Sequence, residues 1–153
     1  MLRQLWAGLT IVLMLNGGGE LWQEKREEVL LPVLMYHEVR YDDPGKDAIL
    51  PEEMERDLQY LQREGYTTVL MEDVLAFVYA GKSLPEKPIL LTFDDGYESS
   101  YRRLFPLLKR YGAKAVISVI GKSADEFSLM PEQGGPYVHA SWEGRVESRV
   151  SWW

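Results

Sequence analysis

Cysteine is absent from this sequence, and histidine occurs only twice, as His37 and His139. The absence of cysteine excludes disulfide bonds, cysteine-ligated zinc and cysteine nucleophiles. It does not identify a compartment, because an exported protein without cysteine simply needs no oxidative folding.

Positive charge is also in short supply. Lysine and arginine number 17 against 24 aspartates and glutamates, which gives a formal net charge of -7 and a pI near 4.9. An acidic surface repels phosphate backbones and anionic lipid headgroups. Nucleic acid is therefore excluded as a partner, and an anionic membrane surface is a poor partner for the folded part.

The sequence lacks an apolar run of the ~20 residues that a membrane-spanning helix needs. The uncharged run Leu5–Leu15 follows Arg3 and ends at the small residues 16–19. This three-part layout is typical of a secretory signal. Without a clear A-x-A cleavage site an uncleaved anchor is an alternative, and a buried core helix is another. We predict a signal or anchor over residues 1–19, a linker over 20–28, and export to a cell-wall, extracellular or membrane-anchored location.

What is present is an alternation of strand and helix patterns. Apolar runs predict strands at residues 29–36, 67–70, 89–93 and 115–120, and helices are predicted at 51–64, 72–79 and from about 99 to 111. This order predicts an α/β fold with a largely parallel sheet.

The predicted helices have recognisable ends and faces. Gly65, Gly81 and Gly112 suit left-handed helix stops, and Pro106 must kink or restart the third helix. Met54, Leu58 and Leu61 form the buried stripe of the first helix, and Val74, Leu75 and Val78 are expected to point inward from the second. Residues 125–136 resemble a loop.

Two adjacent carboxylates, Asp94 and Asp95, follow directly after the most apolar strand. In α/β folds ligands collect outside the carboxyl ends of the strands. One carboxylate there could bind a divalent cation while the other accepts a proton from water, and Gly96 would permit a sharp turn. Asp-Gly is also a common turn dipeptide, so these residues alone favour a plain turn over a site.

The surrounding residues resemble the polysaccharide deacetylases, the NodB-like carbohydrate esterase family 4. Leu91–Tyr97 (LTFDDGY) is similar to the first motif of that family, and Pro32–Val39 (PVLMYHEV) is similar to the opening strand of many members. The resemblance covers roughly residues 29–142 and leaves residues 143–153 as a tail outside the family pattern.

The resemblance implies a fold and an activity. The fold would be the N-terminal portion of a distorted (β/α) barrel with mostly parallel strands. The activity would be metal-dependent removal of N-acetyl groups from a polysaccharide that contains N-acetylated amino sugars. Asp94 would be the general base that activates water, and Asp95 would bind a divalent metal, expected to be zinc.

The sequence departs from the family where the metal is concerned. The second family motif supplies two histidines, spaced H-x-x-x-H, and a catalytic zinc normally has three protein ligands. Neither His37 nor His139 lies in such a motif, although Val138–Glu143 resembles the stretch that precedes it. The later arginine and histidine motifs are missing too. We therefore expect a C-terminally truncated member whose half barrel leaves an unpaired strand edge, and we expect it to be inactive and marginally stable.

The remaining candidates have competing roles. His37 follows a buried strand, where it could contact substrate or simply hydrogen-bond the barrel rim. Tyr97 could stack on a sugar ring, although core packing is the commoner role of such residues. His139 is expected on a solvated loop. We take His37 and Tyr97 as candidate substrate-binding residues.

Two other functions compete with a deacetylase. The first is a non-catalytic fragment that binds glycan weakly at most. The second is a phosphatase-like hydrolase with paired aspartates, which typically requires D-x-D after the strand and is disfavoured by D-D-G.

Overall fold

The computed structural model describes residues 28–41, 46–129 and 151–152. The elements follow one another as β1 (Val33–Tyr36), β2 (Glu38–Val39), β3 (Ala48–Ile49), α1 (Pro51–Arg63), β4 (Thr67–Val69), α2 (Met71–Ala80), β5 (Pro88–Phe93), the π-helical turn η1 (Ser100–Leu104), α3 (Phe105–Tyr111), β6 (Val116–Ile117), α4 (Gly121–Leu129) and β7 (Ser151–Trp152). From α1 onward helical segments and strands alternate, and every strand pair in the described residues is parallel, which confirms the predicted α/β class.

β5 is the centre of the main sheet. It pairs with β1 along Leu90–Phe93, with β4 along Pro88–Leu90 and with β6 along Thr92–Phe93, while β7 extends the sheet from β6. All of its residues are buried except Thr92, which is partly buried. An unbroken apolar strand is what a parallel strand covered on both faces requires.

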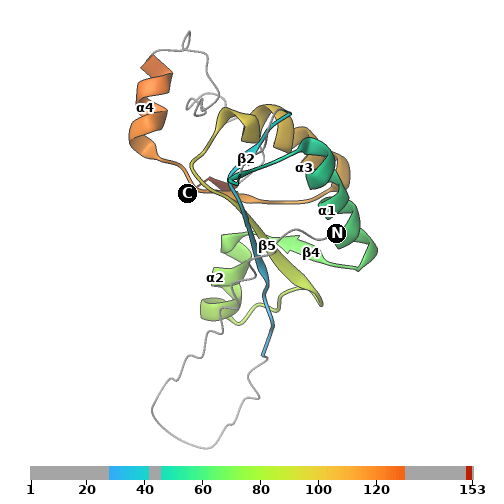
Figure 1. Ribbon diagram of the computed structural model, residues 1–153. Helices are drawn as coiled ribbons and strands as arrows, with labels where there is room; N and C mark the ends of the chain where they lie inside the picture. Colours follow the sequence, from blue (N-terminus) through green and yellow to red (C-terminus); the bar gives the residue numbers. More distant parts are fainter. Residues whose placement is uncertain (1–27, 42–45, 130–150, 153) are drawn as a thin grey trace, which may run out of the picture.

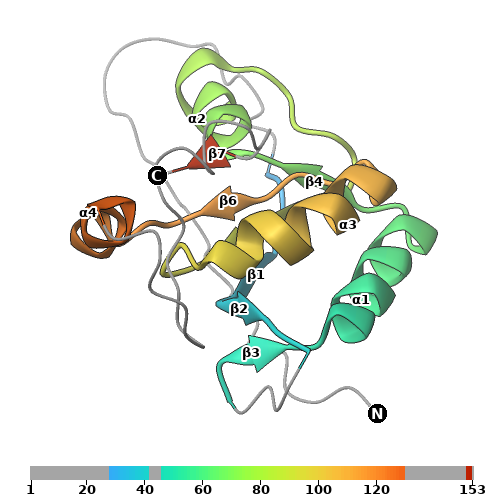
Figure 2. The same ribbon diagram turned by 90° about the horizontal axis from the view of Figure 1, so that it is seen from above.

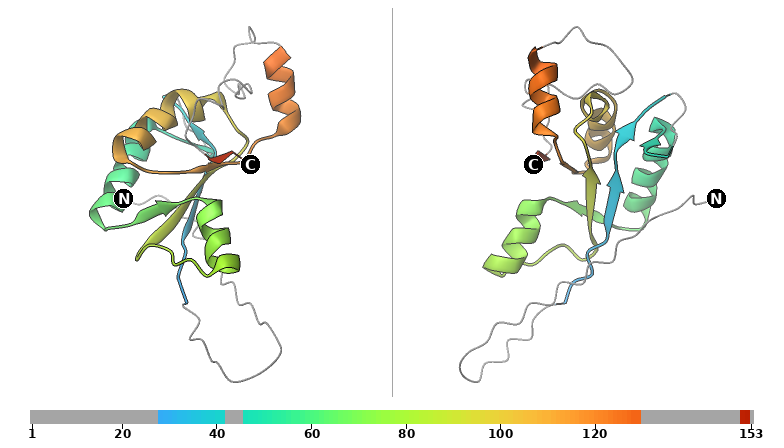
Figure 3. Two further views of the ribbon diagram at one scale, coloured as in Figure 1. Left: turned by 180° about the vertical axis from the view of Figure 1, so that it is seen from behind. Right: turned by 60° about the vertical axis from the view of Figure 1, so that its left-hand side comes forward.

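Helices cover both faces of this sheet. α1 and α3 lie on one face and α2 lies on the other, as Figures 1 and 3 show. The larger apolar cluster joins Met54, Leu58 and Leu61 of α1 to Leu91 and Phe93 of β5. A smaller cluster on the opposite face contains Leu90, Val69 and Val116, against which Met71 and Val74 of α2 pack.

The helices end where local chemistry predicts. Gly65, Gly81 and Gly112 adopt positive φ angles of 77°, 64° and 61°, which confirms them as left-handed helix stops. At the helix starts, the Leu50 amide donates to Glu53 Oε2 at 3.3 Å and the Leu70 amide donates to Asp73 Oδ2 at 2.9 Å. These carboxylates satisfy amides that the helices themselves leave without partners.

Several expectations were wrong in detail. Of the three α2 residues expected to point inward, only Val74 packs against the core, because Leu75 and Val78 are 42% and 39% exposed. α4 occupies residues 121–129, part of which was expected to be a loop. The short parallel pair of β2 and β3, visible in Figure 2, was not anticipated. The restart at Pro106 is confirmed, since η1 ends at Leu104 and α3 begins at Phe105.

Other expectations fall outside the described residues. These include residues 1–19, the linker up to residue 27, His139 and most of the tail. In the part of the chain that the structure describes, no helix is long and apolar enough to span a bilayer. The described strands form an open sheet and not a closed ring.

Candidate active site

The candidate residues lie where β1 and β5 end side by side. Tyr36 is the register partner of Phe93, and the Asp94 amide donates to the Tyr36 carbonyl oxygen at 2.9 Å. Because both strands run in the same direction, His37 and Asp94 follow at the same edge of the sheet.

Side-chain alternation assigns these two residues to one face. Val33 and Met35 are the register partners of Leu90 and Thr92, so these four side chains share a face of the sheet. His37 and Asp94 come next in that alternation, on the face opposite Tyr36 and Phe93. His37 and Asp94 therefore follow the adjacent ends of β1 and β5, while their shared site and their chemical roles stay predictions.

The turn after β5 is tightly constrained. Asp95 and Gly96 have φ angles of 68° and 67°, and Asp95 is the one non-glycine residue with positive φ in the described ranges. A Cβ at Gly96 would lie 3.3 Å from both Cα and Cγ1 of Val119. The turn therefore requires glycine at position 96, and it places two partly buried carboxylates next to each other.

Tyr36 supports the end of β5 from the face that α1 and α3 cover. Its ring stacks on Phe93 with centroids 5.0 Å apart and an interplanar angle of 17°. Its hydroxyl donates to Asp57 Oδ2 of α1 at 3.0 Å. Burial, reinforced by the neighbouring Asp57 carboxylate, raises the pKa of Tyr36 well above its ordinary value. Burial likewise raises the pKa of Asp57, and the hydrogen bond from Tyr36 partly offsets that rise.

Sequence reasoning missed this support because it depends on contacts between distant residues. Tyr36 and Asp57 are 21 positions apart, and a tyrosine beside a histidine gives no local signal of a partner on a helix. Sequence patterns also gave no signal for Ser99 and Arg103, whose side chains bind the backbone of the distant residue Val39.

A complete metal centre is not formed by the described residues. They contain no group of three or more His, Cys, Asp and Glu side chains arranged to hold an ion. Asp94, Asp95 and His37 thus do not fit a three-ligand zinc site on their own. Glu38, next to His37, is buried and lies 3.9 Å from the Arg40 guanidinium.

Tyr97 and Tyr101 lie beside the turn. Tyr101 stacks on Phe105 with ring centroids 6.3 Å apart, so its ring packs within the protein. Tyr97 is partly buried, and its carbonyl oxygen accepts the Ser100 amide at 3.0 Å. Its role as a substrate-binding residue stays a prediction.

A separate open cavity of about 510 Å³ lies between β4, α2 and the loop that follows α2. Thr67, Glu72, Lys82 and Lys114 are among its lining residues, and none of the candidate site residues lines it. The candidate site and this cavity are therefore different places on the molecule.

Comparisons with known proteins point in one direction. Residues 81–143 match the family model described as polysaccharide deacetylase. A putative polysaccharide deacetylase, YxkH of Bacillus subtilis, is 37% identical over 103 residues, which are 67% of this chain and 36% of that protein. The poly-beta-1,6-N-acetyl-D-glucosamine N-deacetylase of Escherichia coli is 41% identical over 66 residues, 43% of this chain and 10% of that protein.

Solved structures agree with the sequence relatives. A de-N-acetylase from Aggregatibacter actinomycetemcomitans superposes with a TM-score of 0.67 at 26% identity, over 80% of this chain and 53% of that one. The chain therefore spans about a third of its Bacillus subtilis relative and about half of this structure.

Proposed function

The chain belongs to the polysaccharide deacetylase family, and from this we propose that it supplies the water-activating edge of a hydrolase that removes N-acetyl groups from a polysaccharide. The observation that carries the proposal is the Asp94–Asp95 pair at the end of buried β5, next to His37 at the end of β1. The substrate class is a polymer of N-acetylated amino sugars, in line with the substrate named for the Escherichia coli relative.

Each candidate residue has a role in this proposal. Asp94 acts as the general base and accepts a proton from the water that attacks the acetamide carbonyl. Asp95 contributes one carboxylate ligand toward a divalent metal, with zinc as the expected ion. His37 and Tyr97 contact the sugar. Among the described residues, Asp94, Asp95 and His37 do not complete a zinc site on their own.

The 153-residue chain by itself is proposed to be inactive. One aspartate and one histidine cannot replace the three protein ligands of a catalytic zinc, and neither histidine of the sequence lies in an H-x-x-x-H motif. Acetate release from an N-acetylglucosamine oligomer tests this, with and without added Zn²⁺ and with Asp94→Asn as the blank. We expect no release above the blank. Robust release that Asp94→Asn abolishes would refute inactivity and support the role of Asp94.

A second candidate function is weak glycan binding without turnover. NMR titration with the same oligomer separates it from an inert fragment, because binding that uses the site would be weakened by His37→Ala.

The N-terminal run Leu5–Leu15 supports an exported or anchored location for the protein. N-terminal sequencing of the protein recovered outside the cytoplasm of a bacterial host would test export.

A further inference from the structure

The two chain segments that carry the candidate residues are fastened together at several points. One segment runs from Tyr36 to Val39 and contains His37. The other runs from Asp94 to Arg103 and contains Asp95. The bond from the Asp94 amide to the Tyr36 carbonyl joins the segments at their beginnings. The contacts at their far ends are of a different kind.

Val39 has two buried backbone groups that its neighbouring strand cannot satisfy. β2 pairs with β3 through the residues on either side of Val39: the Glu38 amide donates to the Asp47 carbonyl at 3.3 Å, and the Arg40 amide donates to the Ile49 carbonyl at 2.9 Å. The N–H and C=O of Val39 therefore point to the opposite edge of β2. Val39 is 0% exposed, so these groups need partners within the protein.

Two side chains from the segment after the Asp94–Asp95–Gly96 turn supply those partners. Ser99 Oγ accepts the Val39 amide at 3.4 Å, and Arg103 Nη1 donates to the Val39 carbonyl at 2.8 Å. The Arg103 guanidinium also lies 5.2 Å from the centroid of the Tyr41 ring. Ser99 and Arg103 thus take the place of a neighbouring strand along this edge of β2.

Ser99 directly precedes a π-helical turn, and Arg103 lies within it. η1 spans Ser100–Leu104 between Ser99 and α3, and short π-helical turns often occur near functional sites. In a helix, residues four apart in sequence lie on the same side, which lets Ser99 and Arg103 reach one residue of β2. Both side chains therefore bind the same residue, Val39.

We propose that Arg103, assisted by Ser99, is a positioning residue that holds His37 against Asp94 and Asp95. With Tyr36 fixed to Asp94 at one end and Val39 fixed to Ser99 and Arg103 at the other, the intervening His37 has little freedom to move away. This inference rests on the proposed function only in taking His37 and the two aspartates as the site.

The residue before Arg103, Arg102, offers a matched control. Arg102 is exposed and pairs with Glu98 at 2.6 Å, with no bond to β2 among the contacts described. Arg102→Met and Arg103→Met make the same chemical change one residue apart. Only the second removes a bond that fastens the two segments.

NMR of the full chain reads the position of His37 directly. The sequence has two histidines, so His37→Ala identifies the His37 imidazole signal. In Arg103→Met we expect that signal to shift by more than its linewidth. Amide exchange at Val39 and Asp94 should become about tenfold faster, as loss of one charged hydrogen bond implies. Exchange at Leu91 in the core should be unchanged, and Arg102→Met should change none of these.

Two outcomes would overturn the inference. One is an unshifted His37 signal in Arg103→Met, and the other is equal acceleration of all amides, which would mean a general loss of stability. If Arg103→Met does not fold, Ser99→Ala removes the other side-chain bond to Val39. The same His37 signal and the same amide exchange rates are then measured in Ser99→Ala. Arg103→Lys keeps a donor and should restore the His37 signal in part.

A titration with an N-acetylglucosamine oligomer separates this inference from the proposed function. If His37→Ala weakens oligomer binding and Arg103→Met does not, the positioning role is wrong although glycan binding stands. If the unaltered chain does not bind the oligomer, the glycan-binding part of the proposed function fails, and the spectra above still decide the role of Arg103.

Discussion

Asp95 and Gly96 take left-handed backbone conformations in succession, directly after β5. A left-handed conformation costs an L-residue roughly 1–2 kcal/mol, and a short polar side chain such as aspartate tolerates it better than most. The D-G pair indicated that Gly96 would turn the chain, and Asp-Gly is also a pair favoured in turns whose two central residues both have positive φ. Strain at a candidate ligand position is typical of functional sites, where the surrounding fold maintains it.

Gly96 and Gly112 allow backbone strain to be separated from crowding. Both have positive φ, yet a Cβ at Gly112 would meet nothing within 4 Å, whereas one at Gly96 would lie 3.3 Å from the Val119 backbone. Gly112→Ala should lower the free energy of unfolding by about 1–2 kcal/mol from strain alone. Gly96→Ala should lower the free energy of unfolding by about 1–3 kcal/mol more than Gly112→Ala, because its Cβ would overpack against Val119. Urea denaturation followed by circular dichroism measures both, and equal losses would show that the loop around Val119 yields.

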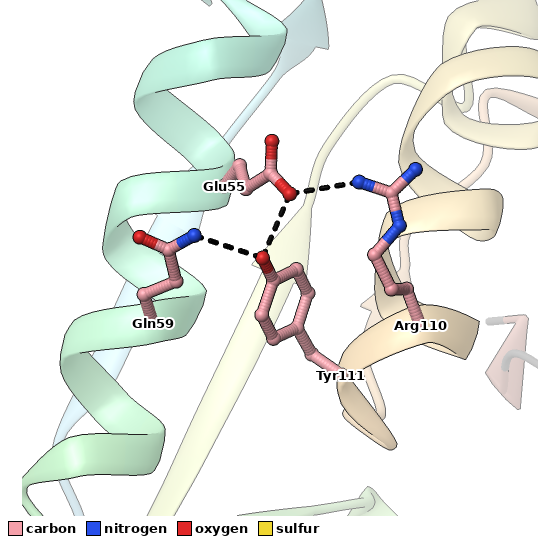
Figure 4. A network of polar contacts seen from close by, with 4 residues as sticks. All are labelled: Glu55, Gln59, Arg110 and Tyr111. Carbon is pink, nitrogen blue, oxygen red and sulfur yellow. Dashed lines mark hydrogen bonds and ion pairs between the residues drawn. The ribbon is translucent and has the colours of Figure 1, made fainter.

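Between elements, α1 and α3 are joined by a polar network at their surface (Figure 4). Glu55 Oε1 accepts hydrogen bonds from Tyr111 at 2.7 Å and from Arg110 at 2.8 Å, and Gln59 donates to the Tyr111 hydroxyl at 2.9 Å. The bonds from Tyr111 and Arg110 lower the pKa of the Glu55 carboxyl.

A lowered pKa in the folded state gives this network a defined pH dependence. The stabilisation from Glu55 is fully present above the ordinary pKa of glutamate and is lost as pH falls through the lowered value. Glu55→Gln should therefore reduce the melting temperature at neutral pH, and the difference from the unaltered chain should shrink in acid. Glu52→Gln, an exposed change on the same helix, is the control. A deficit that is constant with pH would contradict the assignment.

The elements also show what local patterns could and could not predict. α1 was predictable because Met54, Leu58 and Leu61 form one stripe that is buried, and the ends of the helix carry their own signals. α2 was harder: it is apolar on several sides, and only packing against Val69 and Leu90 selects Met71 and Val74 as its inward residues. β2 and β3 are two residues each, too short for a period to appear.

For the molecule as a whole, the motif strand and its carboxylates were readable from the sequence. The pairing around them was not, because it depends on residues far apart in the chain. Nothing near Val39 predicts that Ser99 and Arg103, 60 and 64 positions away, will complete its hydrogen bonds. The same limit applies to the strand order of the main sheet. β1 lies beside β5 and not beside β4, the next strand of that sheet in sequence.

Metal response is a property of the whole chain. A ligand that binds only the folded state raises stability in proportion to RT ln(1 + [L]/Kd), so a tight zinc site would raise the melting temperature strongly. Because the described residues hold no three-ligand group, we expect excess Zn²⁺ to raise the melting temperature by less than about 2 °C, which is under the shift that ~1 kcal/mol produces in a domain of this size. EDTA-treated protein is the control. A large rise that Asp95→Asn abolishes would instead reveal a metal site that includes Asp95.

The central place of β5 also bears on how the chain is made. β1 and β4 both precede β5 in sequence, yet each is hydrogen-bonded to β5 and neither to the other in the described residues. During synthesis on the ribosome, which proceeds from the N-terminus, these two strands leave the exit tunnel with no partner to pair with. The main sheet can begin to assemble only once β5 emerges, so β1 and β4 stay without their strand partner while the residues between them and β5 are translated.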